Sequence, residues 1–518
     1  MSGIEAKSQA DITPNATTSM QNKPNMGEYE VPELKPRFST LAAIGIQYSI
    51  SAAPLAVGGY LAFILGLGGS PYFFYGYLVA AAGQTLICIS LAEIAAVYPH
   101  VSGQVFWTSA LAPPRLSRVL SYCNGAATTL GWIFANTGSY VFSAQMWIAA
   151  MEVRFPGYQH ENYQTFLLSV AVALYGVILN VWLFRWYPYF TVFMVWFINA
   201  STVYIFVALL VRATPKVSAH DVFVKVINQS GWSSDSLVFL LNFLPGGVAI
   251  SCFDTAAHMA EEMEHPHKQV PQVMVGATLL SVATSVPMVI AFLFCIVNPM
   301  ALLNPVGGQP VFQVFVDGFR SDTLLVITLI IYLVVWMAAS PGCLATGSRL
   351  VWSFAKHGGL PLPKWLGHVD PELLIPVNAV YLTALSATLI GLLVFGPSTV
   401  LNGVYGAGGV CFFVSYGLPI WLLLCRGRKV LPTRRYFNLG RLGPWVNIAA
   451  VCWQFLAVVF LCFPLYRPVT TTNMNWASLC AVSGFFIFGI NWLLYSRRHY
   501  HDPARLVLPR DDDSQDVA

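Results

Sequence analysis

The sequence predicts an all-α polytopic membrane protein with about twelve transmembrane helices, of which the first and the sixth are broken. Its 518 residues are 56% hydrophobic and only 10% charged, whereas roughly a quarter of the residues in ordinary soluble domains are charged. Apolar runs of about 20 residues, the length that crosses a hydrocarbon layer, recur along the chain. These runs are too long and too uniformly apolar for barrel strands, so helices must satisfy their backbone groups in lipid.

The expected spans occupy most of the chain and are separated by short loops. We place them at residues 41–67, 72–97, 120–151, 165–183, 189–211, 236–259, 274–297, 324–344, 375–394, 400–425, 445–463 and 476–495. The stretches between them are too short for a soluble catalytic domain. A transmembrane domain at residues 39–495 is therefore expected, flanked by polar tails at residues 1–38 and 496–518 whose composition predicts disorder.

Several kinds of site are not supported by the sequence. The N-terminal tail lacks the apolar core of a cleavable signal peptide, so the first span must direct insertion itself. The ten cysteines lie in or beside apolar runs, without CxxC or Cys/His spacing, and we interpret them as small buried hydrophobic residues rather than metal ligands. Without a Walker-type phosphate-binding loop, nothing supports direct ATP coupling. We expect no cofactor, and the coupling ion, proton or sodium, stays open.

The distribution of lysine and arginine predicts that both termini lie in the cytoplasm. With the N-terminus inside, all but six of the 27 Lys and Arg residues fall in cytoplasmic segments, as the positive-inside rule requires. The six outer residues are Arg154, Arg212, Lys216, Lys225, Arg320 and Arg467. The net charge of +4 is thus a topology signal and not a nucleic-acid footprint.

Of the two Asn-x-Ser/Thr sequons, Asn15 would be cytosolic, whereas Asn228 lies in an outer loop and is a candidate for glycosylation.

The first and sixth spans each carry an interruption. Pro54 has no N–H to donate to the carbonyl of Ile50, and residues 245–247 form a Pro-Gly-Gly step in the sixth span. Matching interruptions in two inverted halves indicate a midplane binding site, because unwound backbone offers free polar groups and helix ends to a solute. Close packing of small residues is the alternative explanation. The candidate solute-binding residues at these breaks are Ser51, Ala52, Ala53, Val248, Ala249, Ser251 and Cys252.

Five sequence blocks share their order with one known family. Residues 252–271 resemble the sixth-span signature of the amino acid/polyamine/organocation superfamily, in particular the fungal amino acid/choline permease family, with the pattern G-Y-D-x-x-x-H-x-x-E-E-x-x-N-P. The other blocks are S-L-A-E at residues 90–93 with G-Q-V-F-W at 103–107, G-Q-P-V-F-Q at 308–313, S-R at 348–349 with K-H-G-G-L-P at 356–361, and L-G-R at 439–441. The resemblance covers residues from about 39 to 495.

This resemblance implies a fold and an activity. The fold is a five-plus-five inverted repeat, here about residues 39–211 and 236–425, followed by two extra helices at about 445–495. The implied activity is secondary active transport of a small amine or amino acid, such as choline or gamma-aminobutyrate, by alternating access. The implied location is the plasma membrane. An enzyme is not expected, and the oligomeric state stays open.

Departures from the family pattern leave the substrate open. Cys252 and Phe253 replace the usual Gly and Tyr, and His265 replaces the usual Asn. The first span has Ala52 and Ala53 where superfamily amino acid carriers have Gly-Ser-Gly around a carboxylate. Two alternatives therefore remain, namely a carrier or exporter of a specialised nitrogenous metabolite and a nutrient sensor that does not transport.

Two ionisable residues within the sixth span are candidates for coupling. A charged group inside a span costs about 2.5 to 3.5 kcal/mol on insertion scales, which favours a functional reason for Asp254. Asp254 is either a counter-ion for a cationic substrate, a proton carrier, or a cap for the second half of the helix. His258 lies one turn later on the same face and can share a proton with it, with a purely structural histidine as the alternative.

The remaining candidates lie on other spans. Glu93 and Arg349 are expected near the inner ends of the second and eighth spans, where they form gating ion pairs or extend to the interface. Glu261, Glu262 and Lys268 are expected in a solvated inner loop. In the third span Trp132, Asn136 and Tyr140 share one helix face, which either faces the broken helices, where an aromatic ring can hold a cation, or packs against neighbours. Cys343 and Thr346 lie near the pocket that the resemblance implies.

Overall fold

The computed structural model describes residues 34–471 and 473–507. Ten helical segments in these residues are long and apolar enough to cross a membrane, which confirms the prediction of an α-helical multi-pass membrane protein. They are α1 to η1 at Thr40–Ile64, α3 at Gly69–Val97, α6 at Asn162–Val181, η2 and α7 at Phe184–Arg212, α12 at Pro266–Cys295, α14 at Asp322–Lys356, α16 and η6 at Val377–Phe395, α17 at Ser398–Arg426, η8 and α18 at Gly440–Leu461, and the segment that begins with α19 at Ala477–Arg505.

Two more of the expected spans take other forms. The third is α5 (Ser117–Arg154), a helix of 38 residues with a lower mean hydropathy. The sixth is divided into α9 (Asp235–Leu241), α10 (Leu244–Ala249) and α11 (Thr255–His258). The count of twelve and the inverted repeat stay predictions.

The first interruption falls at Ala52. Helix α1 (Thr40–Ser51) ends there because Ala52 adopts left-handed backbone angles, φ 37° and ψ 38°. The chain restarts as α2 (Ala53–Ala56), where Pro54 occupies the first turn and its missing N–H is harmless. It then tightens into the 3-10 helix η1 (Val57–Ile64).

The second interruption falls between α10 and α11. Cys252 has a φ of 62°, which is again unusual for a residue with a side chain. Gln84 donates a hydrogen bond to the carbonyl of Gly247, and Thr255 Oγ1 donates one to the carbonyl of Cys252 at 2.7 Å. Side chains thus donate to carbonyls at the break, where the helical hydrogen-bond ladder is interrupted.

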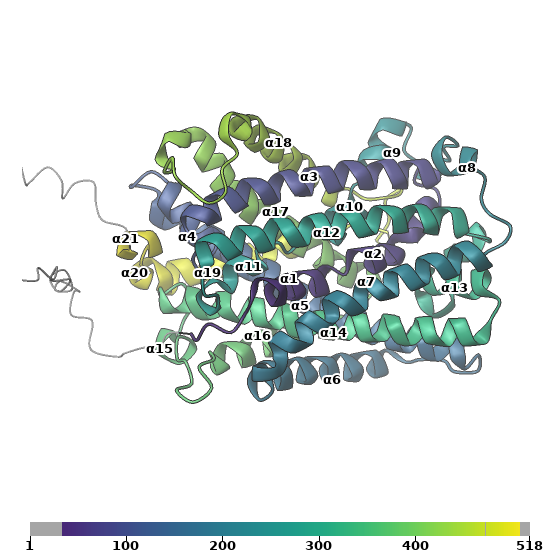
Figure 1. Cartoon of the computed structure of the whole chain (residues 1–518), viewed down its shortest axis with the longest axis horizontal. Coiled ribbons are helices and arrows are strands. Elements are labelled where there is room, and N and C mark those ends of the chain that lie inside the picture. Colours follow the sequence, from purple (N-terminus) through teal and green to yellow (C-terminus); the bar gives the residue numbers. More distant parts are fainter. Residues whose placement is uncertain (1–33, 472, 508–518) are drawn as a thin grey trace, which may run out of the picture.

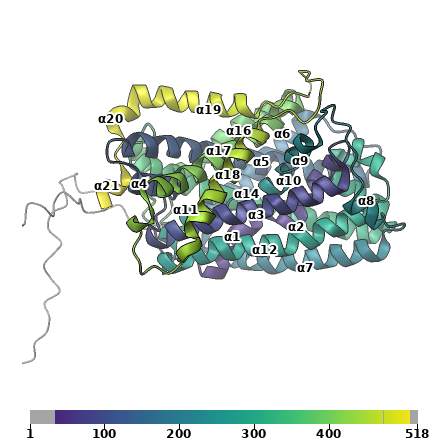
Figure 2. The ribbon, with the colours of Figure 1, turned by 90° about the horizontal axis from the view of Figure 1, so that it is seen from above.

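The helices form one elongated bundle with α5 in its interior (Figure 1). Helix α5 packs against α6, α14, α16 and α17, while α1 packs against α7, α12 and α14. Helix α19 (Ala477–Asn491) lies at the edge of the bundle (Figure 2). Short helices cap the bundle, among them α4 (Gln104–Leu111), α13 (Pro310–Phe319) and α15 (Pro363–Leu366).

Both ends of the described chain lie at the same end of the bundle. Figure 1 places α20 (Arg497–His499) and α21 (Pro503–Val507) there, together with the residues that precede α1. The side chain of Leu34 is buried beside Trp352 near the end of α14. The N–H of His501 donates to the carbonyl of His357, one residue after that helix, at 2.8 Å. We call this end the inner face.

The left-handed angles at Ala52 lead to a stability prediction. A residue with a Cβ pays about 1–2 kcal/mol in this conformation, whereas glycine adopts it readily. We expect Ala52→Gly to leave the thermal unfolding temperature unchanged or to raise it. Ala42→Gly, at a similarly buried position inside α1, should lower the free energy of unfolding by about 1 kcal/mol. Thermal unfolding of the purified variants tests this, and a larger loss at Ala52 than at Ala42 would contradict it.

Candidate functional site

The carboxylate of Asp254 lies in the second interruption and is fully buried. Its Oδ2 accepts hydrogen bonds from Gln104 Nε2 at 2.8 Å, Trp132 Nε1 at 3.0 Å and His258 Nε2 at 3.1 Å. Its Oδ1 accepts a hydrogen bond from the hydroxyl of Tyr416 at 2.7 Å. These donors come from α4, α5, α11 and α17, so one charged group joins four elements. Hydrogen bonds to an ionised acceptor are among the strong ones, and they offset the cost of burial.

The hydrogen-bond partners of the two His258 ring nitrogens indicate how many protons the Asp254–His258 pair needs. Nδ1 lies 2.8 Å from the carbonyl oxygen of Val101, which can only accept, so Nδ1 must carry a hydrogen. Nε2 faces the Asp254 carboxylate, which also only accepts when it is ionised. Both ring nitrogens therefore need a hydrogen, unless the carboxyl group itself is protonated. In either case the pair holds one proton more than a carboxylate beside a neutral imidazole.

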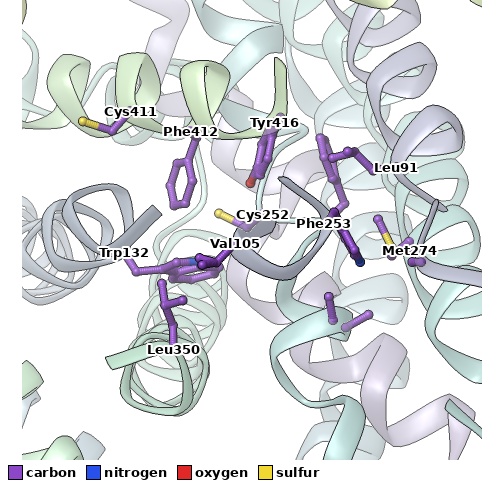
Figure 3. Packing of buried hydrophobic residues seen from close by; sticks show 14 of the residues in the cluster. Leu91, Val105, Trp132, Cys252, Phe253, Met274, Leu350, Cys411, Phe412 and Tyr416 are labelled. Carbon is purple, nitrogen blue, oxygen red and sulfur yellow. The ribbon is translucent and has the colours of Figure 1, made fainter. Parts of the chain in front are cut away.

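Aromatic rings surround the interruption next to this pair. Cys252 lies between Trp132 of α5 and the rings of Phe412 and Tyr416 of α17 (Figure 3). The ring centroids of Trp132 and Phe412 are 5.3 Å apart, and those of Phe253 and Tyr416 are 4.6 Å apart. The sequence analysis identified Trp132 and Cys252, whereas Gln104 and Tyr416 were missed as site residues. Gln104 belongs to one of the matched blocks, but its position in sequence carries no sign of the contact with Asp254.

The third and eighth helices are joined beside this cluster. Asn136 Nδ2 donates to the carbonyl of Trp132 at 2.8 Å and to the carbonyl of Cys343 at 3.0 Å. The hydroxyl of Tyr140 donates to Asn136 Oδ1 at 3.2 Å. The structure therefore places Trp132, Asn136 and Cys343 together. Thr346 is one turn further along α14 and donates to the carbonyl of Gly342.

The candidates on the first interruption lie in a different part of the core. Ala52 and Ala53 pack in one hydrophobic cluster together with Ala249, while Cys252 belongs to the cluster that contains Trp132 and Cys343. The hydroxyl of Ser51 lies 3.3 Å from that of Ser281 on α12. On the second interruption, Ser251 Oγ donates to the carbonyl of Val248 at 2.7 Å, and Ala249 is buried.

Arg349 forms a buried ion pair at the inner face, with a partner that the sequence analysis did not identify. Its Nε lies 2.9 Å from Glu262 Oε1, and both side chains are buried. The guanidinium also lies over the ring of Phe184, 4.6 Å from its centroid. Our expectation of a solvated Glu262 is wrong, because the residue lies under the N-terminal segment. The two residues are 87 positions apart, so only the fold brings them together.

Glu93 is buried at the inner end of α3 and binds other arginines. Its Oε1 accepts hydrogen bonds from Arg428, from Arg435 Nη2 at 2.6 Å and from the N–H of Leu439 at 2.9 Å. Its partners thus come from the loop between α17 and α18 and not from α14. Glu93 and Arg349 lie in two separate ion pairs at the same face.

The residues before α1 form a strap over the Arg349–Glu262 pair. The N–H groups of Arg37 and Phe38 donate to the carbonyl of Glu262 at 2.9 and 3.1 Å. Arg37 also donates to the carbonyl of Leu373 at 2.7 Å, and Leu34 is buried against Trp352. The strap therefore connects the end of the sixth span to the eighth span and to the loop that follows it.

His100 precedes Val101, whose carbonyl accepts the hydrogen bond from His258. Burial of the ring, with His357 and Lys356 nearby, lowers the pKa of His100 to about 3. The ring stacks on Phe106 at 4.4 Å. His100 is thus neutral at physiological pH.

Asn228, the candidate glycosylation site, is held in a folded loop between α8 (Ala219–Phe223) and α9, at the end of the bundle opposite the inner face (Figure 1). Its Nδ2 donates to the carbonyl of Trp232 at 3.0 Å and to Asp235 Oδ1 at 2.9 Å. Its Oδ1 accepts a hydrogen bond from the Ser230 hydroxyl at 2.7 Å. Glycosylation there stays a prediction, and Asn15 lies outside the described residues.

Comparison with known proteins identifies the class of the chain. The sequence profile of a family described as amino acid permease matches residues 38–486. The chain is 27% identical over 476 residues to the choline transporter of Saccharomyces cerevisiae, which covers 90% of this chain and 83% of that protein. It is 28% identical to the swainsonine transporter of Arthroderma benhamiae (90% and 92% covered) and 27% identical to amino-acid permease 2 of Neurospora crassa (91% and 87% covered).

A solved structure shows the same fold. The manganese transporter of Eremococcus coleocola superposes with a TM-score of 0.53, covers 92% of this chain and 99% of its own, and is 12% identical. The fold and the family together define a membrane transporter and not an enzyme. The chain belongs to the amino acid permease family, which confirms the resemblance found in the sequence.

The buried Arg349–Glu262 pair leads to a prediction about stability. Removing one partner leaves the other charge buried and unpaired, so we expect Arg349→Ala and Glu262→Ala each to cost about 3–5 kcal/mol. The double variant should cost clearly less than the sum. The free energies of unfolding of the three detergent-purified variants and the wild type form a double-mutant cycle. Arg185→Ala, at an exposed arginine of the same face, is the control. Additive losses would show that the two side chains do not interact.

Proposed function

We propose that this permease transports a small amine or amino acid by secondary active transport coupled to protons, and that the Asp254–His258 pair holds the coupled proton. The observation that carries the proposal is the proton count, because both nitrogens of His258 face hydrogen-bond acceptors. Loss of the extra proton would turn the Nε2 lone pair toward a carboxylate oxygen, and the contact would become repulsive. Protonation would therefore control how firmly α11 is held against α4, α5 and α17.

The Asp254 carboxylate already accepts hydrogen bonds from four side chains. This favours a role for Asp254 as a proton carrier over a role as the counter-ion of a cationic substrate. Four donors already occupy Asp254, one of them His258. A cationic substrate would have to displace one of them. A helix cap is disfavoured for the same reason, since side chains of other helices take up the carboxylate oxygens.

The surroundings of the second interruption support an organic substrate with a positive group. The faces of Trp, Tyr and Phe rings attract an organic cation by about 0.5 to 2 kcal/mol each, and four such rings surround Cys252. Relatives are named a choline transporter and an amino-acid permease. A choline-like amine or an amino acid is therefore the proposed substrate class.

Alternating access requires the inner face to open. Entry of the solute into the cytoplasm would need the broken helices to separate from α14, which the Arg349–Glu262 pair and the N-terminal strap oppose. We assign this pair as the inner gate. The Lys and Arg distribution supports a cytoplasmic inner face, and the common location of both described chain ends agrees with it. The plasma membrane is the proposed location, following the family resemblance.

A second candidate substrate is a specialised nitrogenous metabolite. A relative that is 28% identical to this chain, close to the 27% of the choline transporter, is named a swainsonine transporter. The first interruption also lacks the Gly-Ser-Gly of amino acid carriers. A sensor without transport activity would bind such a solute but carry none.

Uptake into proteoliposomes tests the function. Choline, gamma-aminobutyrate, basic and neutral amino acids, and swainsonine should be offered with an acidic exterior. We expect accumulation of at least one of them, and we expect it to be lost when a protonophore removes the gradient. Ligand-dependent thermal stabilisation without flux would contradict the carrier and favour the sensor.

Substitutions at the pair test the proton site. We expect Asp254→Asn and His258→Gln to reduce gradient-driven accumulation at least tenfold, because the carrier can no longer take up the proton. Exchange of labelled for unlabelled substrate should persist. His368→Gln, at an exposed histidine, should behave like the wild type. If Asp254→Asn instead weakens a cationic substrate far more than a zwitterionic one, Asp254 is the counter-ion.

A further inference from the structure

The loop between α17 and α18 concentrates positive charge at the inner face. Residues 426–445, which we call the basic loop, contain no aspartate or glutamate. Their six cationic residues are Arg426, Arg428, Lys429, Arg434, Arg435 and Arg441. Arg426 donates to the carbonyl of Ala110 at 2.9 Å, and the neighbouring Ser109 accepts a hydrogen bond from the N–H of Ala504. The basic loop therefore lies at the face that carries the chain ends (Figure 1).

One side of the basic loop is fixed to the second and seventh spans. Arg428 and Arg435 bind the buried Glu93 of α3. Gln272 Nε2 of α12 donates to the hydroxyl of Tyr436 at 2.5 Å, and Lys268 lies 5.7 Å from the centre of that ring. These contacts hold the loop in place between two helices that pack against each other.

The other side of the basic loop presents charges without partners. Lys429, Arg434 and Arg441 are exposed, and within the described part of the chain they make neither an ion pair nor a hydrogen bond. Glu93 is the single carboxylate that pairs with the loop there, so a strong positive excess remains. This charge has nothing to balance it in the described residues.

Large apolar side chains lie directly beside these charges. Leu442 is 69% exposed and Trp445 is 72% exposed at the start of α18, and Trp421 is 53% exposed near the end of α17. Exposed tryptophans at helix ends mark the level of the lipid headgroups. The exposed cations of the basic loop therefore lie near residues of the kind that mark the headgroup level.

We propose that the basic loop is a binding site for anionic phospholipid headgroups of the inner leaflet. Clusters of four to eight Lys and Arg residues next to a membrane helix attract anionic lipid headgroups, and Leu442 and Trp445 provide the apolar contact that a soluble anion would not use. Through Glu93 and Tyr436, a bound headgroup stabilises the inner ends of α3 and α12. The site is separate from Asp254 and requires no particular transport substrate.

Thermal unfolding in nanodiscs tests the site directly. The full chain should be measured in phosphatidylcholine alone and with increasing phosphatidylserine. We expect phosphatidylserine to raise the unfolding temperature of the wild type, and added salt to reduce the effect. In Lys429→Gln/Arg434→Gln/Arg441→Gln we expect the affinity for phosphatidylserine to fall about fivefold per charge and roughly a hundredfold in total. The unfolding temperature of this variant should therefore not rise over the phosphatidylserine fractions that raise that of the wild type.

A matched variant and two soluble anions separate this proposal from its competitors. Arg115→Gln/Arg185→Gln/Lys364→Gln removes three exposed charges of the inner face outside the basic loop and should respond like the wild type. Equal responses of the two triple variants would overturn the proposal. It would also fail if inorganic phosphate, or a synthetic peptide of residues 508–518 with its three consecutive aspartates, reproduced the shift in phosphatidylcholine nanodiscs.

Discussion

Solvation of the Asp254 carboxylate is the constraint on which the centre of the molecule depends. A charge within the membrane loses its water and must receive an equivalent set of donors from the protein. Here the donors come from Gln104, Trp132, His258 and Tyr416, which belong to four different elements. These elements cannot shift independently, because each movement would leave the carboxylate short of a donor. The same geometry allows the protonation of one small group to act on several helices together.

The broken helices are possible only because neighbouring side chains compensate for the lost backbone hydrogen bonds. Lipid offers no replacement, so irregular backbone at membrane depth must be enclosed by protein. Gln84 of α3 serves the carbonyl of Gly247, and the hydroxyl of Tyr332 on α14 donates to the carbonyl of Leu55 at 3.2 Å. Each break is thus supported by a different helix, which links the position of α3 to the sixth span and that of α14 to the first.

Features that depend on local sequence could be predicted, whereas those that depend on distant partners could not. The spans follow from apolar length, the break near Pro54 from the missing N–H, and the proximity of Asp254 and His258 from helical spacing. The Arg349–Glu262 pair joins segments 87 residues apart, and the Glu93–Arg435 pair joins segments 342 residues apart. Hydrophobic pattern says nothing about which charges meet, because packing of the helices decides it. A glutamate in a short polar stretch therefore suggested solvent, although the fold buries it.

The N-terminal strap connects the chain before α1 to the contacts of the proposed inner gate. Separation of the sixth span from α14 would have to break the two hydrogen bonds from Arg37 and Phe38 to Glu262. It would also have to remove Leu34 from the buried apolar cluster that contains Trp352. Tension or bulk applied to the polypeptide just before Leu34 would be transmitted to the same contacts. If the Arg349–Glu262 pair is the proposed inner gate, a protein that binds the N-terminal tail would change the rate of the transport cycle without contacting the solute.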